Sequence, residues 1–132
     1  MEEPTSFRQV LSSISVIKVL DFFLEHEDFD YSLTEISDFA NVSWSTLHTF
    51  WKDLVKWEIV IKTRRIGRAD LYKLNKESKI VKKLLELDRA ISDYFVDKEL
   101  RRQGYDPEEL IKGEKTTQNP RKKEQVVLTS KI

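Results

Sequence analysis

The sequence predicts a mainly α-helical domain that contains one small β-hairpin and continues into a long helix. Two observations lead to this fold class. Apolar residues recur at helical spacing in three segments before Glu58 and again after Asn75. Between these two residues the apolar period changes from 3.6 to 2, which is typical of strands. With 132 residues, 39% of them apolar, the chain suits one compact domain with a modest core.

Residues 1–13 are predicted to form an N-terminal arm that is helical around Phe7. Ser13 or Ser15 can cap the first long helix, which we expect to run to about His26. The following stretch EDFDYS interrupts the helical pattern and is expected to be short and extended. The apolar positions of the first long helix are Val16, Ile17, Val19, Leu20, Phe23 and Leu24.

Two shorter helices follow, separated by a sharp turn. Ser32 lies three residues before Glu35, which is the spacing of a capping box at the start of a helix. Asn41 suits the turn because it enters the left-handed region at low cost. Ser43 then caps a third helix, which we expect to end at about Trp57.

The period-2 segment predicts two strands, Ile59–Arg64 and Ala69–Leu74, joined by the link RIGR. Gly67 in this link supplies the positive φ that a tight hairpin requires. Asn75 is expected to cap the long helix Lys76–Gln103, which ends at Gly104.

The remaining residues, 104–132, are expected to form a short helix and a tail. Asp106 followed by Pro107 has the pattern of an N-cap and first helical residue. After Gly113 the composition is polar and irregular, which predicts disorder from residue 114 to 132. The basic stretch NPRKKEQ in this tail is either a weak phosphate contact or an ordinary tail.

The third helix carries a polar face that is suited to binding DNA. Its apolar residues Leu47, Trp51 and Leu54 are expected to face inward. Short polar side chains near the start of an exposed helix can reach base edges in the major groove, and lysine can contact phosphate. The alternative is an ordinary solvated helix face. The predicted DNA-contacting residues of this segment are Ser43, Trp44, Ser45, Thr46, His48, Thr49 and Lys52.

The hairpin adds cationic side chains to this prediction. Lys62, Arg64, Arg65 and Arg68 are concentrated near its tip. They are predicted to contact phosphates, and an arginine at the tip is suited to entering the minor groove. The alternative is a charged strand edge that prevents pairing with other sheets. Clustered arginine favours phosphate recognition because its planar fork matches phosphate oxygens.

Residues 14 to about 100, with the order helix, helix, turn, helix, hairpin and long helix, resemble the winged helix-turn-helix domains of small archaeal and bacterial regulators. The stretch RRIGRADLYKLN leading into a long helix resembles the MarR and ArsR types. The resemblance implies a DNA-binding domain over residues 14–75 and a homodimer that represses transcription at a pseudo-palindromic site. Two positions depart from the family pattern, since Asn41 and Glu58 stand where glycine is common.

The helix over residues 76–103 is predicted to form the dimer interface. A single small domain has no evident use for so long a helix, and pairing with a second copy would bury its apolar seam. The alternative is that the helix folds back on its own domain. The predicted interface residues are Ile80, Leu84, Leu87, Ile91, Tyr94 and Phe95, with Phe7, Val10 and Leu11 of the arm as possible additions.

Composition argues against several other classes of protein. The chain has no cysteine, which excludes a disulfide scaffold and thiolate metal sites. Its two histidines are far apart and no catalytic or phosphate-loop motif occurs, so we expect no enzyme activity, no metal and no cofactor. The absence of a long apolar run or signal-peptide pattern predicts a cytoplasmic, nucleoid-associated protein without a membrane partner.

Charge is distributed unevenly along the chain. Residues 1–60 carry 11 acidic and 4 basic side chains, whereas residues 61–103 carry 13 basic and 7 acidic ones. This asymmetry suits an anionic partner for the second segment. It also motivates an alternative function, a winged helix that binds proteins in a transcription, replication or DNA-segregation assembly, with Trp44 and Trp57 exposed. A third possibility is a small-molecule effector of unknown identity beside aromatics such as Phe22, Tyr94 and Phe95.

Overall fold

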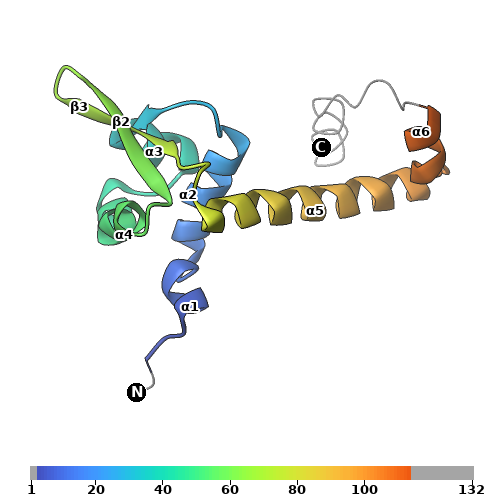
Figure 1. Ribbon diagram of the computed structural model, residues 1–132, viewed down its shortest axis with the longest axis horizontal. Helices are drawn as coiled ribbons and strands as arrows, with labels where there is room; N and C mark the ends of the chain where they lie inside the picture. The colour runs from blue at the N-terminus through green and yellow to red at the C-terminus, as the bar shows by residue number, and fades with distance from the viewer. Residues whose placement is uncertain (1–2, 114–132) are drawn as a thin grey trace. The chain divides into compact units, whose positions relative to one another are not determined.

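The computed structural model of the protein describes residues 3–113 and consists of two units, which divide between Leu85 and Glu86. The first unit contains helices α1 to α4, three strands and the beginning of helix α5 (Figure 1). The segment 114–132, predicted to be disordered, and its basic stretch lie outside the described residues. In the first unit the elements are α1 (Ser6–Val10), α2 (Ile14–Glu25), β1 (Tyr31–Ser32), α3 (Leu33–Ala40), α4 (Trp44–Lys56), β2 (Val60–Ile66), β3 (Ala69–Leu74) and the first turns of α5 (Lys79–Arg102).

The helices begin where the sequence predicts local caps. The Ser13 hydroxyl accepts a hydrogen bond from the Val16 amide at 3.3 Å, so Ser13 and not Ser15 caps α2. Ser32 and Glu35 form the reciprocal capping box of α3. These caps are local and depend on residues only three positions apart, which is why sequence spacing alone predicts them.

Helices α3 and α4 both end in a left-handed residue, at Asn41 with φ 55° and at Glu58 with φ 59°. In α4 the Glu58 amide donates to the Val55 carbonyl and the Ile59 amide to the Leu54 carbonyl, each at 3.0 Å. This pair of bonds defines a Schellman motif. Asn41 and Glu58 stand where the family pattern commonly has glycine. Among the described residues they are also the two non-glycine residues with a positive φ.

The sheet has three antiparallel strands in the order β1-β3-β2, so the predicted hairpin gains a third strand. Strand β1 has only two residues, with Tyr31 opposite Tyr72 and Ser32 opposite Leu71. The strand partner of this stretch lies about forty residues away, so residue spacing predicts only an extended segment here. The added strand ties the segment between α2 and α3 to the hairpin.

The core of the first unit lies between α2, α3, α4 and one face of the sheet. Phe23, Ile36, Leu47, Leu54 and Ile59 are almost completely buried there. Trp51 of α4 also packs against Tyr72 of β3, with ring centroids 5.0 Å apart. The inward face predicted for the third helix is thus confirmed, and this packing leaves the opposite face of α4 exposed.

Helix α5 begins at Lys79, three residues later than predicted, because Asn75 does not cap it. The Asn75 side-chain amide instead donates to the Glu58 carbonyl at 2.8 Å, which links the end of β3 to the end of α4. The Ser78 hydroxyl accepts from the Val81 amide at 3.3 Å at the start of the helix. The Asn75 side-chain oxygen still accepts a local hydrogen bond, from the Glu77 amide at 3.2 Å, so Asn75 forms a turn before the helix and Ser78 caps it.

The second unit contains the rest of α5 and α6 (Pro107–Gly113). Helix α5 ends at Gly104, whose φ is 91°, as predicted. The Asp106 carboxylate accepts from the Glu108 amide at 3.0 Å, which supports the predicted N-cap before Pro107. No described helix is both long enough and apolar enough to cross a membrane.

Candidate nucleic-acid interface

The exposed face of α4 begins at its N-cap. The Ser43 hydroxyl accepts from the Thr46 amide at 3.2 Å and donates to the Thr46 hydroxyl at 2.8 Å. The Thr49 hydroxyl donates to the Thr46 carbonyl at 2.6 Å. These bonds hold the first turn of the helix in one conformation. The predicted contact residues Ser43, Trp44, Ser45, His48, Thr49 and Lys52 are exposed, and Thr46 is half-buried.

Trp44 is the largest exposed side chain of this face, with 49% of its surface accessible. Its ring packs edge-on against the His48 ring one turn later, with centroids 4.3 Å apart. Helical spacing places such pairs side by side. The two rings therefore form a single projecting aromatic pair, beside which Ser45, Thr49 and Lys52 are open to solvent.

A β-bulge in the hairpin decides which basic side chains share a face with α4. Lys62 pairs with Tyr72 and Arg64 with Leu71, so Thr63 has no partner of its own in β3. Directly paired residues of antiparallel strands share a face. Because Tyr72 contacts Trp51 of α4, Lys62 lies on the α4 side of the sheet.

The bulge places Arg64 on the other face of the hairpin. Beyond it, Arg65 pairs with Asp70, two residues from Tyr72, and so returns to the α4 side. Arg64 pairs with Leu71 and faces away. Successive strand residues face opposite sides, so the two arginines predicted as one cluster are separated. The bulge decides that Arg65 and not Arg64 shares the α4 side, and the position of a bulge cannot be seen in residue spacing.

Carboxylates accompany most of the basic side chains of the hairpin. On the α4 side, Asp70 lies 3.2 Å from the Lys62 ammonium and 3.8 Å from the Arg65 guanidinium. Both cations remain more than half exposed. Arg68, in the turn, forms no ion pair with any described residue. The α4 side of the hairpin therefore presents two exposed cations beside a single carboxylate, and Arg68 is exposed in the turn.

Arg64 is held by Asp30, in the segment before β1. Its Nε and one terminal nitrogen donate to the two carboxylate oxygens at 2.9 and 3.1 Å, and the Thr63 hydroxyl donates to the same carboxylate at 2.6 Å. These bonds, first from Arg64 and then from Thr63, lower the pKa of Asp30 below its ordinary value. The role of Asp30 as the partner of Arg64 could not be predicted from the sequence, because the two residues are 34 positions apart.

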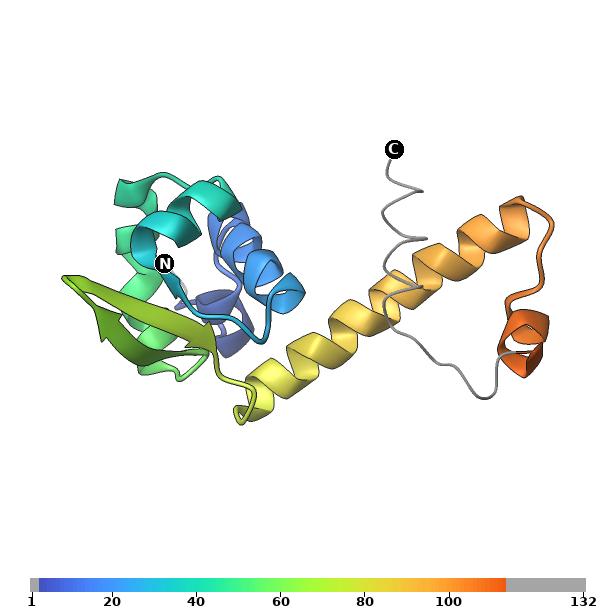
Figure 2. The ribbon, with the colours of Figure 1, turned by 90° about the horizontal axis from the view of Figure 1, so that it is seen from above.

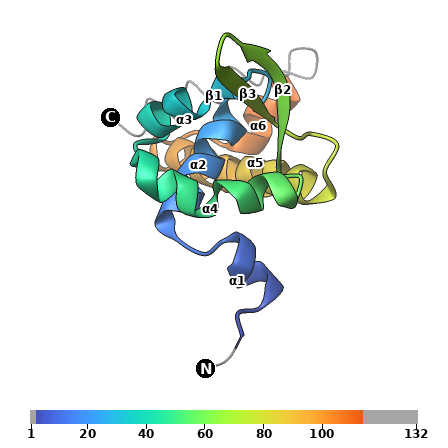
Figure 3. The same cartoon turned by 90° about the vertical axis from the view of Figure 1, so that its left-hand side faces the viewer.

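Figures 1 and 2 both show the hairpin tip and α4 projecting toward the left of the first unit, and Figure 3 looks onto this side. In Figure 3, α4 crosses the front and the hairpin rises from its C-terminal end. Helix α4 and the hairpin thus lie on one side of the unit.

Helix α5 presents apolar side chains in two directions. Val81 and Leu85 are buried in the core of the first unit, and Leu84 is partly buried against it. The other residues of the predicted dimer seam are exposed, namely Ile80, Leu87, Ile91, Tyr94 and Phe95. In the arm, Val10 and Leu11 also pack against the core, whereas Phe7 is exposed.

No group of three or more potential metal ligands occurs among the described residues. Trp57, expected to be exposed, is half-buried and packs against the core.

Neither a protein-family model nor a curated protein sequence matches this chain. Several solved structures resemble it, among them the following two. HlyU from Vibrio cholerae is 22% identical, with a TM-score of 0.51 over 64% of this chain and 86% of that one. The adhesin competence repressor of Streptococcus pyogenes is 15% identical, with a TM-score of 0.50 over 85% of this chain and 92% of that one. Together with the element order, these similarities identify the fold as a winged helix-turn-helix.

Proposed function

We propose that the protein is a sequence-specific regulator of transcription that binds double-stranded DNA. One observation carries the proposal: α4, with its exposed polar residues, and the hairpin, with its exposed cations, lie on the same side of the first unit. An α-helix fits the major groove, and cations beside it suit the flanking phosphates. The resemblance to the adhesin competence repressor supports a repressor in particular.

In this proposal α4 is the recognition helix. Ser45, His48 and Thr49 face the base edges, and Lys52 contacts a phosphate. The Trp44 ring supplies an apolar surface of the kind that packs against thymine methyl groups. Thr46 has a lesser role than its sequence position suggests, because its hydroxyl is engaged in the cap.

In the hairpin, Lys62, Arg65 and Arg68 contact phosphates or the minor groove on the side shared with α4. Arg64 is bound to Asp30 on the other face and takes part only if this pair opens.

The protein is proposed to act as a homodimer in the cytoplasm, on a pseudo-palindromic site. The exposed apolar residues of α5, such as Leu87 and Ile91, are the proposed interface. A two-fold dimer would present its recognition helices to successive major grooves about 34 Å apart.

Selection of bound sequences from a random duplex pool, followed by titration at several salt concentrations, tests this proposal. We expect a two-fold symmetric consensus and a log–log salt slope that falls by about one in Lys52→Ala, because one phosphate contact is lost. Lys18→Ala on α2 is the matched control, since this exposed lysine lies outside the interface and should leave the slope unchanged. Absence of duplex binding at low salt would refute the proposal.

One observation favours a second candidate, a winged helix that binds another protein. Trp44 and His48 form an exposed aromatic pair, and exposed tryptophan is a common anchor in protein interfaces. This alternative predicts no duplex binding at moderate salt and a stable complex with a protein partner that Trp44→Ala abolishes.

A further inference from the structure

A second feature of the first unit, built from α2 and the segment 31–40, is an aromatic cleft. Phe22 and His26 of α2, Tyr31 of β1 and Phe39 of α3 bring four rings together beside it. Neighbouring ring centroids lie 4.8 to 6.1 Å apart. The cleft has a volume of about 530 Å³ and is open to solvent. This volume falls within the usual range of small-molecule sites.

Phe39 is exposed, His26 and Tyr31 are half-buried, and Phe22 is buried behind them. Phe39 has 61% of its surface exposed although it packs against Phe22 and Tyr31. His26 stacks on Phe22, and its Nδ1 lies 2.8 Å from the Phe22 carbonyl oxygen, so Nδ1 carries the hydrogen that is donated. Contiguous exposed aromatic surface in a hollow of the protein is typical of ligand-binding sites.

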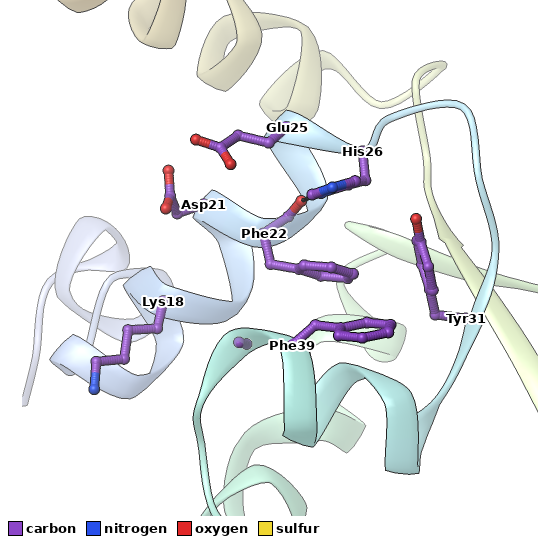
Figure 4. A pocket seen from close by; sticks show the side chains of 8 residues that line it. Lys18, Asp21, Phe22, Glu25, His26, Tyr31 and Phe39 are labelled. Atoms are coloured by element: carbon purple, nitrogen blue, oxygen red, sulfur yellow. Dashed lines mark hydrogen bonds between the residues drawn. The ribbon is translucent and has the colours of Figure 1, made fainter. Parts of the chain in front are cut away.

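Negative charge lies at the rim of the cleft. Asp21 and Glu25 line it from one face of α2, since they are four residues apart. Both are exposed, and neither forms an ion pair with a described residue. Lys18 is the single lysine or arginine in the lining, and Figure 4 shows its ammonium group pointing away from the four rings. The carboxylates of Asp21 and Glu25 also lie on the outer side of α2 in this view, so they act on a ligand at the rings through longer-range attraction. The pKa of Tyr31 is raised above its ordinary value, mainly by burial and then by the negative charges of Glu35 and Asp30.

The combination of ring faces with unpaired carboxylates selects one class of ligand. A cation is attracted to the face of an aromatic ring within about 6 Å and to a carboxylate at longer range. Divalent metals need clustered oxygen or nitrogen ligands, which the described residues do not provide. We propose that this cleft is a binding site for a small organic cation, of the alkylated ammonium type, held by Phe39, Tyr31 and His26 with Asp21 and Glu25 at the rim. This site is separate from the proposed DNA-contacting residues and does not depend on their function.

A pair of isosteric probes tests the charge requirement. Choline carries a trimethylammonium group, and 3,3-dimethylbutan-1-ol has the same shape without the charge. Titration of the full chain followed by amide NMR should show choline shifting signals of residues in α2 and around Phe39, with an affinity at least about fivefold higher than that of the neutral isostere. Equal binding of the two probes, or no shift in this region, would overturn the proposal.

Variants locate the site. Phe39→Ala and the double change Asp21→Asn with Glu25→Gln should each weaken choline binding by about threefold or more. Phe29→Ala is the matched control, because Phe29 is 63% exposed but does not line the cleft. Since Phe39 is an exposed side chain, its truncation should leave the circular dichroism spectrum unchanged. Unaltered choline binding by a folded Phe39→Ala variant would contradict the proposed site.

Discussion

Replacing Glu58 by glycine should stabilise the protein. Glu58 has φ 59° at the end of α4, a conformation that glycine adopts without strain. Its backbone has no route to relax, because the Schellman bonds fix it between Leu54 and Ile59, which are both buried. The Glu58 side chain is exposed and forms no hydrogen bond or ion pair with a residue that the structure describes.

The size of the effect follows from two opposing terms. A non-glycine residue in the left-handed region costs about 1–2 kcal/mol. Glycine loses more backbone conformational entropy on folding than glutamate, which offsets about 0.4–1 kcal/mol of the relieved strain. The net increase in the free energy of unfolding is therefore about 0.5–1 kcal/mol, or about 2–5 °C in Tm for a unit of this size.

Urea denaturation followed by circular dichroism, at one fixed protein concentration, measures this difference. Glu58→Ala removes the same side chain but keeps the strained backbone, so it should remain near the wild type. Lys56→Gly introduces glycine at a right-handed position of the last turn of α4 and should cost about 1 kcal/mol. If Glu58→Gly is no more stable than Glu58→Ala, the backbone at this position stores no strain and the reasoning is wrong.

Three further predictions concern the hairpin and α5. Asp30→Asn should release Arg64 and steepen the log–log salt slope of DNA binding by about one unit. Asp28→Asn is the control, because Asp28 pairs with Lys76 and not with Arg64, and it should leave the slope unchanged. Equal slopes for the two variants would exclude Arg64 as a latent phosphate contact. Because Arg64 lowers the pKa of Asp30, the pair stabilises the folded protein at pH values above the ordinary aspartate pKa. This stabilisation is lost as the pH falls through the lowered pKa. Asp30→Asn should therefore make the free energy of unfolding depend less on pH below about pH 4. Ile91→Glu should convert the proposed dimer to a monomer in sedimentation experiments without changing the helical signal, since Ile91 is exposed in the chain; a monomeric wild type would contradict the dimer.

Local features of the fold could be predicted from the sequence, whereas long-range ones could not. The caps at Ser32 and Ser43, the turn at Asn41 and the hairpin at Gly67 depend on neighbouring residues and are confirmed. The cap at Asn75 is wrong because Ser78 caps α5, while the Asn75 side chain binds the Glu77 amide in the preceding turn and the Glu58 carbonyl, 17 residues away.

The candidate interface shows the same division between local and long-range information. The exposed face of α4 follows from helical period, so its polar residues could be identified from sequence. The pairing of Arg64 with Asp30 depends on the bulge at Thr63 and on chain segments that meet only after folding. The individual contacts to DNA stay predictions.

The bulge at Thr63 decides which arginine of the hairpin tip faces α4. If Thr63 paired regularly with Leu71, Arg64 would lie opposite Asp70 on the α4 side and Arg65 would face away from it. A shift of the bulge toward the turn would thus exchange the guanidinium group offered to a ligand while leaving the composition of the tip intact. Related chains can in this way acquire different specificities through the position of a bulge alone.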